Sequence, residues 1–101
     1  MKKNPVFFLQ LATTIKGEGL TFFGYINNDQ NFEIGDFIEL DFEGKKIKRK
    51  IKRTGLVNSR ENYEKGFSSI SIVVKCKDKI EAKNISKADL KDVECIIYKE
   101  G

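Results

Sequence analysis

The amino-acid sequence predicts an all-β fold, a small closed antiparallel β-barrel of six or seven strands with one short helical turn near Ser86. Apolar and polar side chains alternate at a period of two in several short segments, and turn-forming residues gather between them. No long helical segment separates the strands. A chain of 101 residues is expected to form a single domain, residues 1–101, and a small sheet avoids exposed edges best by closing.

The first strand is expected at VFFLQLA, where odd positions from Phe7 to Leu11 alternate with even positions from Phe8 to Ala12. With the preceding MKKNP, this segment imitates a secretory signal. Because Gln10 interrupts the apolar run and no small-x-small cleavage site follows, we expect a strand of a cytoplasmic protein instead. No segment is long enough to cross a bilayer, so no membrane partner is expected.

The same alternation predicts strands at residues 38–42 and 70–74, and the last strand is expected at residues 93–99. The segment SKADLKD, residues 86–92, begins with Ser86 and has Asp89 three positions later, which is the spacing of a capping box. We therefore expect one or two helical turns there, as a connector before the last strand.

Three glycines, Gly17, Gly19 and Gly24, lie in the segment IKGEGLTFFGYI. A phosphate-binding loop needs a helix after its glycines, but LTFFGYI is aromatic and typical of a strand, and the spacing matches neither the dinucleotide fingerprint nor Walker A. We expect no nucleotide and no other cofactor. Gly17 and Gly19 would permit a tight turn, and Gly24 would mark a bulge or a close backbone approach at a barrel corner.

Two motifs resemble the second domain of the translational GTPases, the β-barrel that follows the G domain in elongation factor Tu and its relatives. The stretch GEGLTFFG supplies the G-x-G, four residues, G of that family, and IGDFIEL supplies its aliphatic-G-D as Ile34, Gly35 and Asp36. The similarity is specific over residues 17–40 and weaker over the rest of the chain. The turn NNDQN before this motif lacks the family's usual glycine and is one residue longer.

The resemblance implies the barrel architecture, with Gly35 and Asp36 at a structural turn. In the family, this barrel helps to contact the tRNA acceptor end or ribosomal RNA beside a G domain. Because we expect a single barrel domain and no G domain, the resemblance implies none of the RNA-contacting residues.

A basic segment, KKIKRKIKR, has seven Lys or Arg among nine residues and follows a stretch from Asp29 to Glu43 with six acids. A tight turn in EGKK, at Glu43-Gly44 or at Gly44-Lys45, would form a hairpin with an outward face of cross-strand ion pairs. A Gly44-Lys45 turn would pair Glu43 with Lys46, Asp41 with Lys48 and Glu39 with Lys50.

Arg49 and Arg53 share the apolar face of this strand with Ile47 and Ile51, so we expect them to leave the core at a barrel end. There a guanidinium could meet a phosphate or a carboxylate. Together with Lys52, they form the candidate basic rim, Arg49, Lys52 and Arg53. The alternative is that the basic segment forms only a solvated ion-pair face.

Aromatic side chains give a second group of candidates. Tyr63 lies in the polar loop NSRENYEKGF and either packs on the barrel or forms a functional loop tip. In FFGY, Phe22 and Phe23 cannot both point inward. An exposed aromatic beside Arg or Lys would favour base stacking, whereas one beside aliphatic side chains would favour a protein partner.

The chain has no histidine, and its two cysteines, Cys76 and Cys95, have no metal-ligand spacing, so no metal site is expected. Both cysteines are expected to be small buried side chains, with a disulfide as the alternative. No residues show the spacing of a catalytic site, and we expect no enzyme. Two binding functions are left, a protein-interaction or regulatory module and, alternatively, an RNA- or ribosome-associated module that uses the basic rim.

Overall fold

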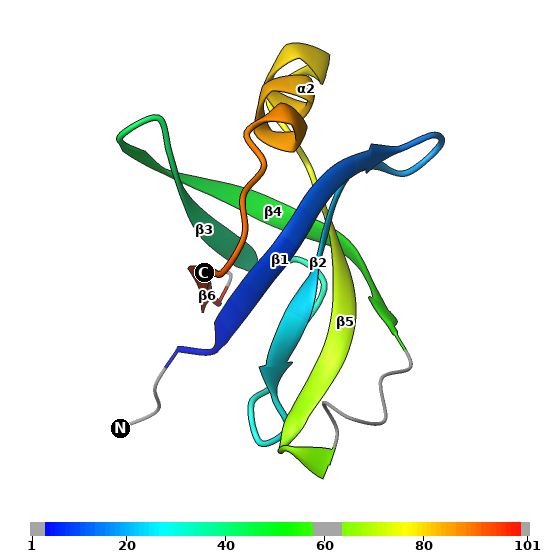
Figure 1. Ribbon diagram of the computed structural model, residues 1–101, viewed down its shortest axis with the longest axis vertical. Helices are drawn as coiled ribbons and strands as arrows, with labels where there is room; N and C mark the ends of the chain where they lie inside the picture. Colours follow the sequence, from blue (N-terminus) through cyan, green and yellow to red (C-terminus); the bar gives the residue numbers. More distant parts are fainter. Residues whose placement is uncertain (1–3, 58–63, 100–101) are drawn as a thin grey trace.

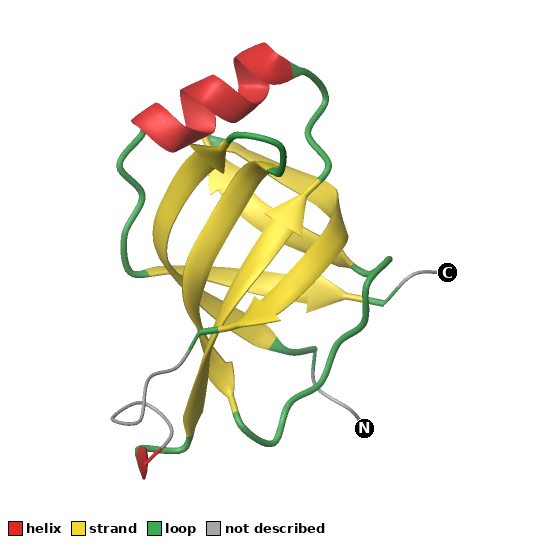
Figure 2. Ribbon diagram, turned by 90° about the vertical axis from the view of Figure 1, so that its right-hand side faces the viewer, coloured by secondary structure: helices red, strands yellow, loops and turns green. Residues whose placement is uncertain are grey.

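The computed structural model describes residues 4–57 and 64–99, which form a closed antiparallel barrel with a helix across one end (Figures 1 and 2). The strand order around the barrel is β1-β2-β5-β4-β3-β6. The predicted all-β barrel is confirmed, with six strands in the described residues. The strands are β1 Val6–Ile15, β2 Gly19–Asn27, β3 Phe37–Phe42, β4 Lys45–Leu56, β5 Phe67–Val74 and β6 Val93–Tyr98.

One apolar core fills the barrel. Alternate side chains of the strands point inward, as a period of two requires, and the helix adds Ile85 from one end. The buried core residues are Phe7, Leu9, Ala12, Leu20, Phe22, Ile26, Ile38, Leu40, Ile51, Ile70, Ile72, Val74, Ile85, Cys95 and Ile97.

The long strand β4 pairs with two neighbours in succession, with β3 over residues 45–50 and with β5 over residues 51–56. Glu43 and Gly44 form the turn between β3 and β4, with φ of 52° and 77°. Two left-handed residues match the twist of a two-residue hairpin. Of the two predicted turns, Glu43-Gly44 is therefore correct and Gly44-Lys45 is wrong.

The observed register sets Asp41 opposite Lys46 and Glu39 opposite Lys48, while Lys50 lies opposite Phe37. The pairs expected for the other turn, Glu43 with Lys46, Asp41 with Lys48 and Glu39 with Lys50, do not form, because a shift of the turn by one residue changes every partner.

The helix α2, Lys79–Lys87, lies earlier in the chain than predicted. Asp78 is its N-cap, and the Asp78 carboxylate accepts a hydrogen bond from the Glu81 N–H at 2.8 Å. Ser86, expected as the cap, lies in the last turn, where its hydroxyl donates to the carbonyl of Lys83. The prediction of a helix start at Ser86 is wrong because an N-cap of equal quality stands eight positions earlier.

Gly17 and Gly19 lie in and after the turn between β1 and β2, with φ of 85° and 100°. Gly24 lies opposite Leu9, where β1 has a bulge between Leu9 and Leu11. A Cβ at Gly24 would lie 2.1 Å from the carbonyl oxygen of Phe8. Gly24 therefore permits a close approach of two backbones at a bend of the barrel.

The β2–β3 connection ends in a turn at Gly35 and Asp36. Gly35 has a φ of 104°, and the carboxylate of the buried Asp36 accepts a hydrogen bond from the Glu33 N–H at 2.9 Å. The barrel closes where β1 pairs with β6, next to a 2.8 Å hydrogen bond from the Ile97 N–H to the Pro5 carbonyl. Among the described residues, no helix has the length and apolar character needed to cross a bilayer.

Candidate functional site

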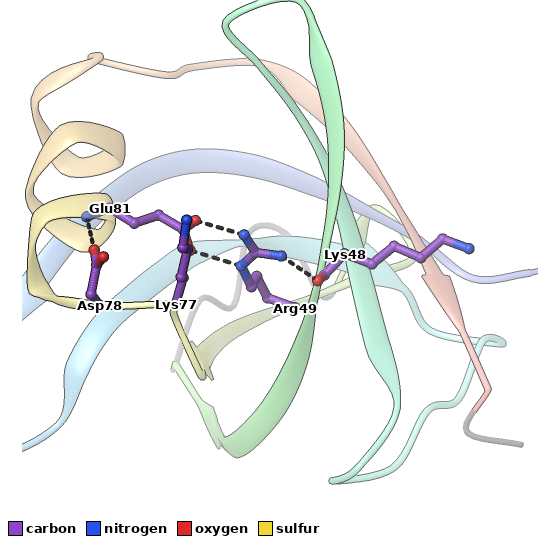
Figure 3. A network of polar contacts seen from close by, with 5 residues as sticks. All are labelled: Lys48, Arg49, Lys77, Asp78 and Glu81. Carbon is purple, nitrogen blue, oxygen red and sulfur yellow. Dashed lines mark hydrogen bonds and ion pairs between the residues drawn. The ribbon is translucent and has the colours of Figure 1, made fainter.

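Arg49 of β4 and Glu81 of α2 form a two-point ion pair at the helix-covered end of the barrel (Figure 3). The Arg49 Nε donates to Glu81 Oε1 at 2.7 Å, and its Nη2 donates to Oε2 at 2.6 Å. Its Nη1 donates to the Lys48 carbonyl at 2.8 Å, and the backbone N–H of Lys77 donates to Glu81 Oε1 at 3.0 Å. Every nitrogen of the guanidinium thus has an acceptor within the chain.

The electrostatics of the pair match this geometry. The hydrogen bonds from Arg49 lower the pKa of the Glu81 carboxyl from its ordinary 4.5 to about 2, against the opposing effect of burial. The same hydrogen bonds raise the pKa of Arg49. The two side chains are only 26% and 15% exposed. A phosphate would have to displace Glu81 to reach Arg49.

Arg53 forms a second ion pair, from its Nη1 to Oε1 of Glu18 in the β1–β2 turn. Lys52 lines a shallow hollow of about 260 Å³ with Glu18, Cys76 and Asp78. The structure thus brings the predicted basic rim to the α2 end of the barrel. Both of its arginines meet carboxylates of the same chain, Glu81 and Glu18, a pairing that the sequence did not predict.

The two cysteines are both free thiols. Burial raises the pKa of the half-buried Cys76 to about 11 and that of the fully buried Cys95 to about 12. A nucleophilic cysteine needs its thiolate form, so neither thiol is activated. Among the described residues, no group of three His, Cys, Asp or Glu side chains could hold a metal ion.

An aromatic cluster lies on the outer face of the barrel. Phe8 stacks on Tyr25 with ring centroids 5.2 Å apart, and Phe67 meets both rings edge-on at 6.1 and 5.1 Å. All three side chains are partly exposed. Edge-on and offset contacts of this kind stabilise a surface cluster.

Next to this cluster lies an outer apolar patch, Leu11, Phe23 and Val57. Leu11 lies directly opposite Phe23 in the register. Leu11 and Val57 are 51% and 42% exposed. Phe23 and Val57 also line a shallow hollow of about 200 Å³ with Gln10, whose Nε2 is buried without a hydrogen-bond partner in the described part of the chain.

The end of the barrel away from α2 holds a larger hollow, the barrel mouth, of about 320 Å³. The sequence did not predict this hollow, because NNDQN has the composition of a simple turn. The lining residues that belong to the described part of the chain are all uncharged: Ile26, Asn27, Asn28, Gln30, Asn31, Phe32, Thr54, Gly55, Leu56, Ser68 and Ile70. Such a lining is notable in a chain with 34% charged residues.

Tyr63, the other candidate binding residue, lies outside the described residues. The fold and these surfaces define a small closed β-barrel with an ion-paired rim at one end and, at the other, a mouth whose described lining residues are uncharged. Comparisons with protein-family models, curated proteins and solved structures find no match for the chain. The resemblance to the second domain of the translational GTPases thus stays a prediction.

Proposed function

We propose that this chain is a non-enzymatic protein-interaction module that binds a partner through the outer apolar patch, Leu11, Phe23 and Val57. The observation that carries the proposal is a contrast between two surfaces. Arg49 is held at two points by Glu81 and is 26% exposed, and Arg53 has an ion pair to Glu18 but stays 63% exposed. Leu11 and Val57 keep 51% and 42% of their surface in water, although both are apolar. Grouped exposed apolar side chains are typical of protein-binding surfaces.

The chemistry around the patch supports a protein partner. The hollow that Phe23 and Val57 line has mostly apolar and neutral residues, with the buried Gln10 Nε2 as an unsatisfied donor. The raised pKa values of both cysteines leave their thiols protonated near neutral pH, which also favours binding over covalent catalysis.

The alternative is an RNA- or ribosome-associated module at the helix-covered end. Lys52 is exposed there, and α2 has lysines at four-residue spacing, Lys79, Lys83 and Lys87, which share one side of the helix. Backbone phosphates would bind these cations. If Arg49 also bound a phosphate, it would lose its two hydrogen bonds to Glu81.

The first test is a salt titration of the full chain against tRNA. We expect weak binding, with a Kd of about 10⁻⁴ M or worse at physiological salt, and little change in an Arg49→Gln/Arg53→Gln double variant. Tight binding with a steep salt dependence would establish the RNA alternative.

The second test is chemical cross-linking of the chain to its partners in cell extract. Leu11→Ser and Val57→Ser should remove a specific cross-linked protein that the arginine double variant retains. If the arginine variant alone removed it, the basic rim would be the binding surface and the proposal would be overturned.

A further inference from the structure

The second half of β4 has a backbone edge that pairs with no other strand. The Val57 N–H donates to the Ser69 carbonyl at 2.9 Å, and in an antiparallel ladder the hydrogen-bonded positions recur at every second residue. Gly55 therefore also faces β5, whereas Thr54 and Leu56 direct their N–H and C=O groups away from it. Within residues 4–57 and 64–99, these groups have no backbone partner.

The position that a strand would take beside this edge lies directly upstream of β3. Backbone pairing with β4 stops at Ile51, which exchanges hydrogen bonds of 2.9 and 2.8 Å with Gly35 and Asp36. There the chain turns, because Asp36 bonds to Glu33 through both its N–H and its carboxylate. The turn at Gly35 and Asp36 thus directs the preceding residues out of the ladder and leaves a slot beside Thr54 and Leu56.

This slot opens into the barrel mouth. Ile26 and Ile70 form part of its lining and belong to the buried core, and Leu56 of β4 is 85% exposed beside it. The other wall comes from the end of β2 and the β2–β3 connection, with Phe32 and four side-chain amides, Asn27, Asn28, Gln30 and Asn31. Three of these amides, Asn27, Asn28 and Gln30, already accept hydrogen bonds through their oxygens within the chain. Their NH₂ groups could donate to the carbonyl oxygens of a peptide backbone.

We propose that the slot beside Thr54 and Leu56 binds an extended, uncharged segment of a partner protein as an added β-strand. This inference rests on the proposed protein-interaction function and names the form in which the partner is recognised. Main-chain hydrogen bonds to an open sheet edge give affinity in such complexes, and pockets for alternate side chains give specificity. Here every second side chain of the segment would lie over Ile26 and Ile70 and should be apolar.

The charges around the slot argue against binding of a nucleic acid there. Phosphates need cationic partners, and none of the described residues that line the mouth is charged. Burial of a charged side chain in the mouth would be unfavourable without an ion-pair partner. The segment should therefore be neutral and about five residues long, the usual length of one strand.

The test uses a library of acetylated and amidated hexapeptides built from Val, Ile, Thr, Ser and Asn, and the ¹⁵N-labelled full chain. Amide hydrogen exchange should slow at Thr54 and Leu56 when a peptide binds, and should change little at Gly55, which already faces β5. Alternate N–H groups of a bound strand face β4, so N-methylation of that set should abolish binding. N-methylation of the other set, which faces away from β4, should leave binding intact.

Leu56→Pro is the key variant. It removes the N–H that faces the slot and leaves the hydrogen bonds to β5 intact, a position at which proline is tolerated in an edge strand. Loss of one backbone hydrogen bond should weaken peptide binding by about tenfold. Leu56→Val, which keeps the N–H, is the matched control and should bind as the wild type does.

Three results would overturn the inference. In the first, no library peptide protects Thr54 and Leu56 at millimolar concentration, and in the second, Leu56→Pro binds peptides as well as Leu56→Val. In the third, the protection depends only on protein concentration, which would assign the slot to a second copy of this chain. Partner cross-linking separates this failure from that of the proposed function. A partner that is lost in Leu11→Ser but retained in Leu56→Pro would support the outer apolar patch and reject strand addition.

Discussion

The guanidinium of Arg49 and the carboxylate of Glu81 join β4 to α2 through two hydrogen bonds of 2.7 and 2.6 Å. Because the fold lowers the pKa of Glu81 from 4.5 to about 2, this contribution to stability is complete above pH 4.5 and is lost as the pH falls from 4.5 through 2. Glu81→Gln should lower the free energy of unfolding by about 1–2 kcal/mol at pH 7.

Urea unfolding between pH 7 and pH 2 measures this effect. The difference between wild type and Glu81→Gln should shrink below pH 4.5, whereas Glu94→Gln, at an exposed position of β6, should have little effect at any pH. If the difference in the free energy of unfolding between wild type and Glu81→Gln stayed constant over the whole pH range, the charge of Glu81 would contribute nothing to stability.

Gly24→Ala should be strongly destabilising. The added Cβ would lie 2.1 Å from the Phe8 carbonyl oxygen and 2.7 Å from Phe7 Cζ, so the bulged backbone or the buried ring must move. We expect a loss of about 3 kcal/mol or more, in the range of strong overpacking. Gly55→Ala is the control, since its Cβ meets only Ser71 Oγ, at 3.0 Å. Equal losses in thermal melts would contradict the close approach.

Lys48→Glu tests the hairpin register. Lys48 lies opposite Glu39, and its Nζ lies 4.0 Å from the ring centroid of Tyr98. The change places two acids opposite each other and removes a cation–π contact, so we expect a loss of about 1 kcal/mol. Lys45→Glu, opposite Phe42, should cost less. Equal melting temperatures of the two variants at low salt would contradict this register.

The thiol of Cys76 should react slowly with Ellman's reagent at pH 8, because burial raises its pKa to about 11. Stability that depends on the protonated thiol is complete below the ordinary pKa of 9.0 and is lost as the pH rises through 11. Cys76→Ser should therefore reduce the loss of stability between pH 9 and pH 11. Fast labelling of the folded chain at pH 8 would show that the thiol is open to solvent.

Gln10→Met should stabilise the protein. The Gln10 Nε2 is buried without a partner in the described residues, and an unsatisfied buried donor costs about 1–3 kcal/mol. A methionine of similar length removes the donor and keeps the packing. Thermal melts measure this effect: the melting temperature of Gln10→Met should exceed that of the wild type, and an equal or lower value would contradict an unsatisfied donor at Gln10.

The barrel was predictable from the sequence because period-two alternation and turn residues are local signals. The two positive φ angles at Glu43 and Gly44 decided between two turns that the sequence left equal. The helix was placed too late, although Asp78 and Glu81 show the spacing of an N-cap and its partner, because Ser86 and Asp89 show a similar spacing and local sequence does not rank the two.

The site was less predictable. Alternation placed Arg49 and Arg53 at a barrel end, but their carboxylate partners, Glu81 and Glu18, are 32 and 35 residues away in sequence. Only tertiary structure brings such groups together. The open edge at Thr54 and Leu56 was equally unpredictable from the sequence. It depends on where the chain before β3 turns away from β4, at Gly35 and Asp36.

The pairing of β1 with β6 also affects how the chain folds as it is synthesised. Val6 lies opposite Ile96, and Pro5 bonds to Ile97, so a ribosome must release nearly the whole described chain before the barrel can close. Until then β1 and β3 each lack their β6 neighbour, and such open edges pair readily with other chains. The interval between emergence of β5 and emergence of β6 is therefore the period in which a nascent chain is most exposed to association with its neighbours on the same messenger RNA.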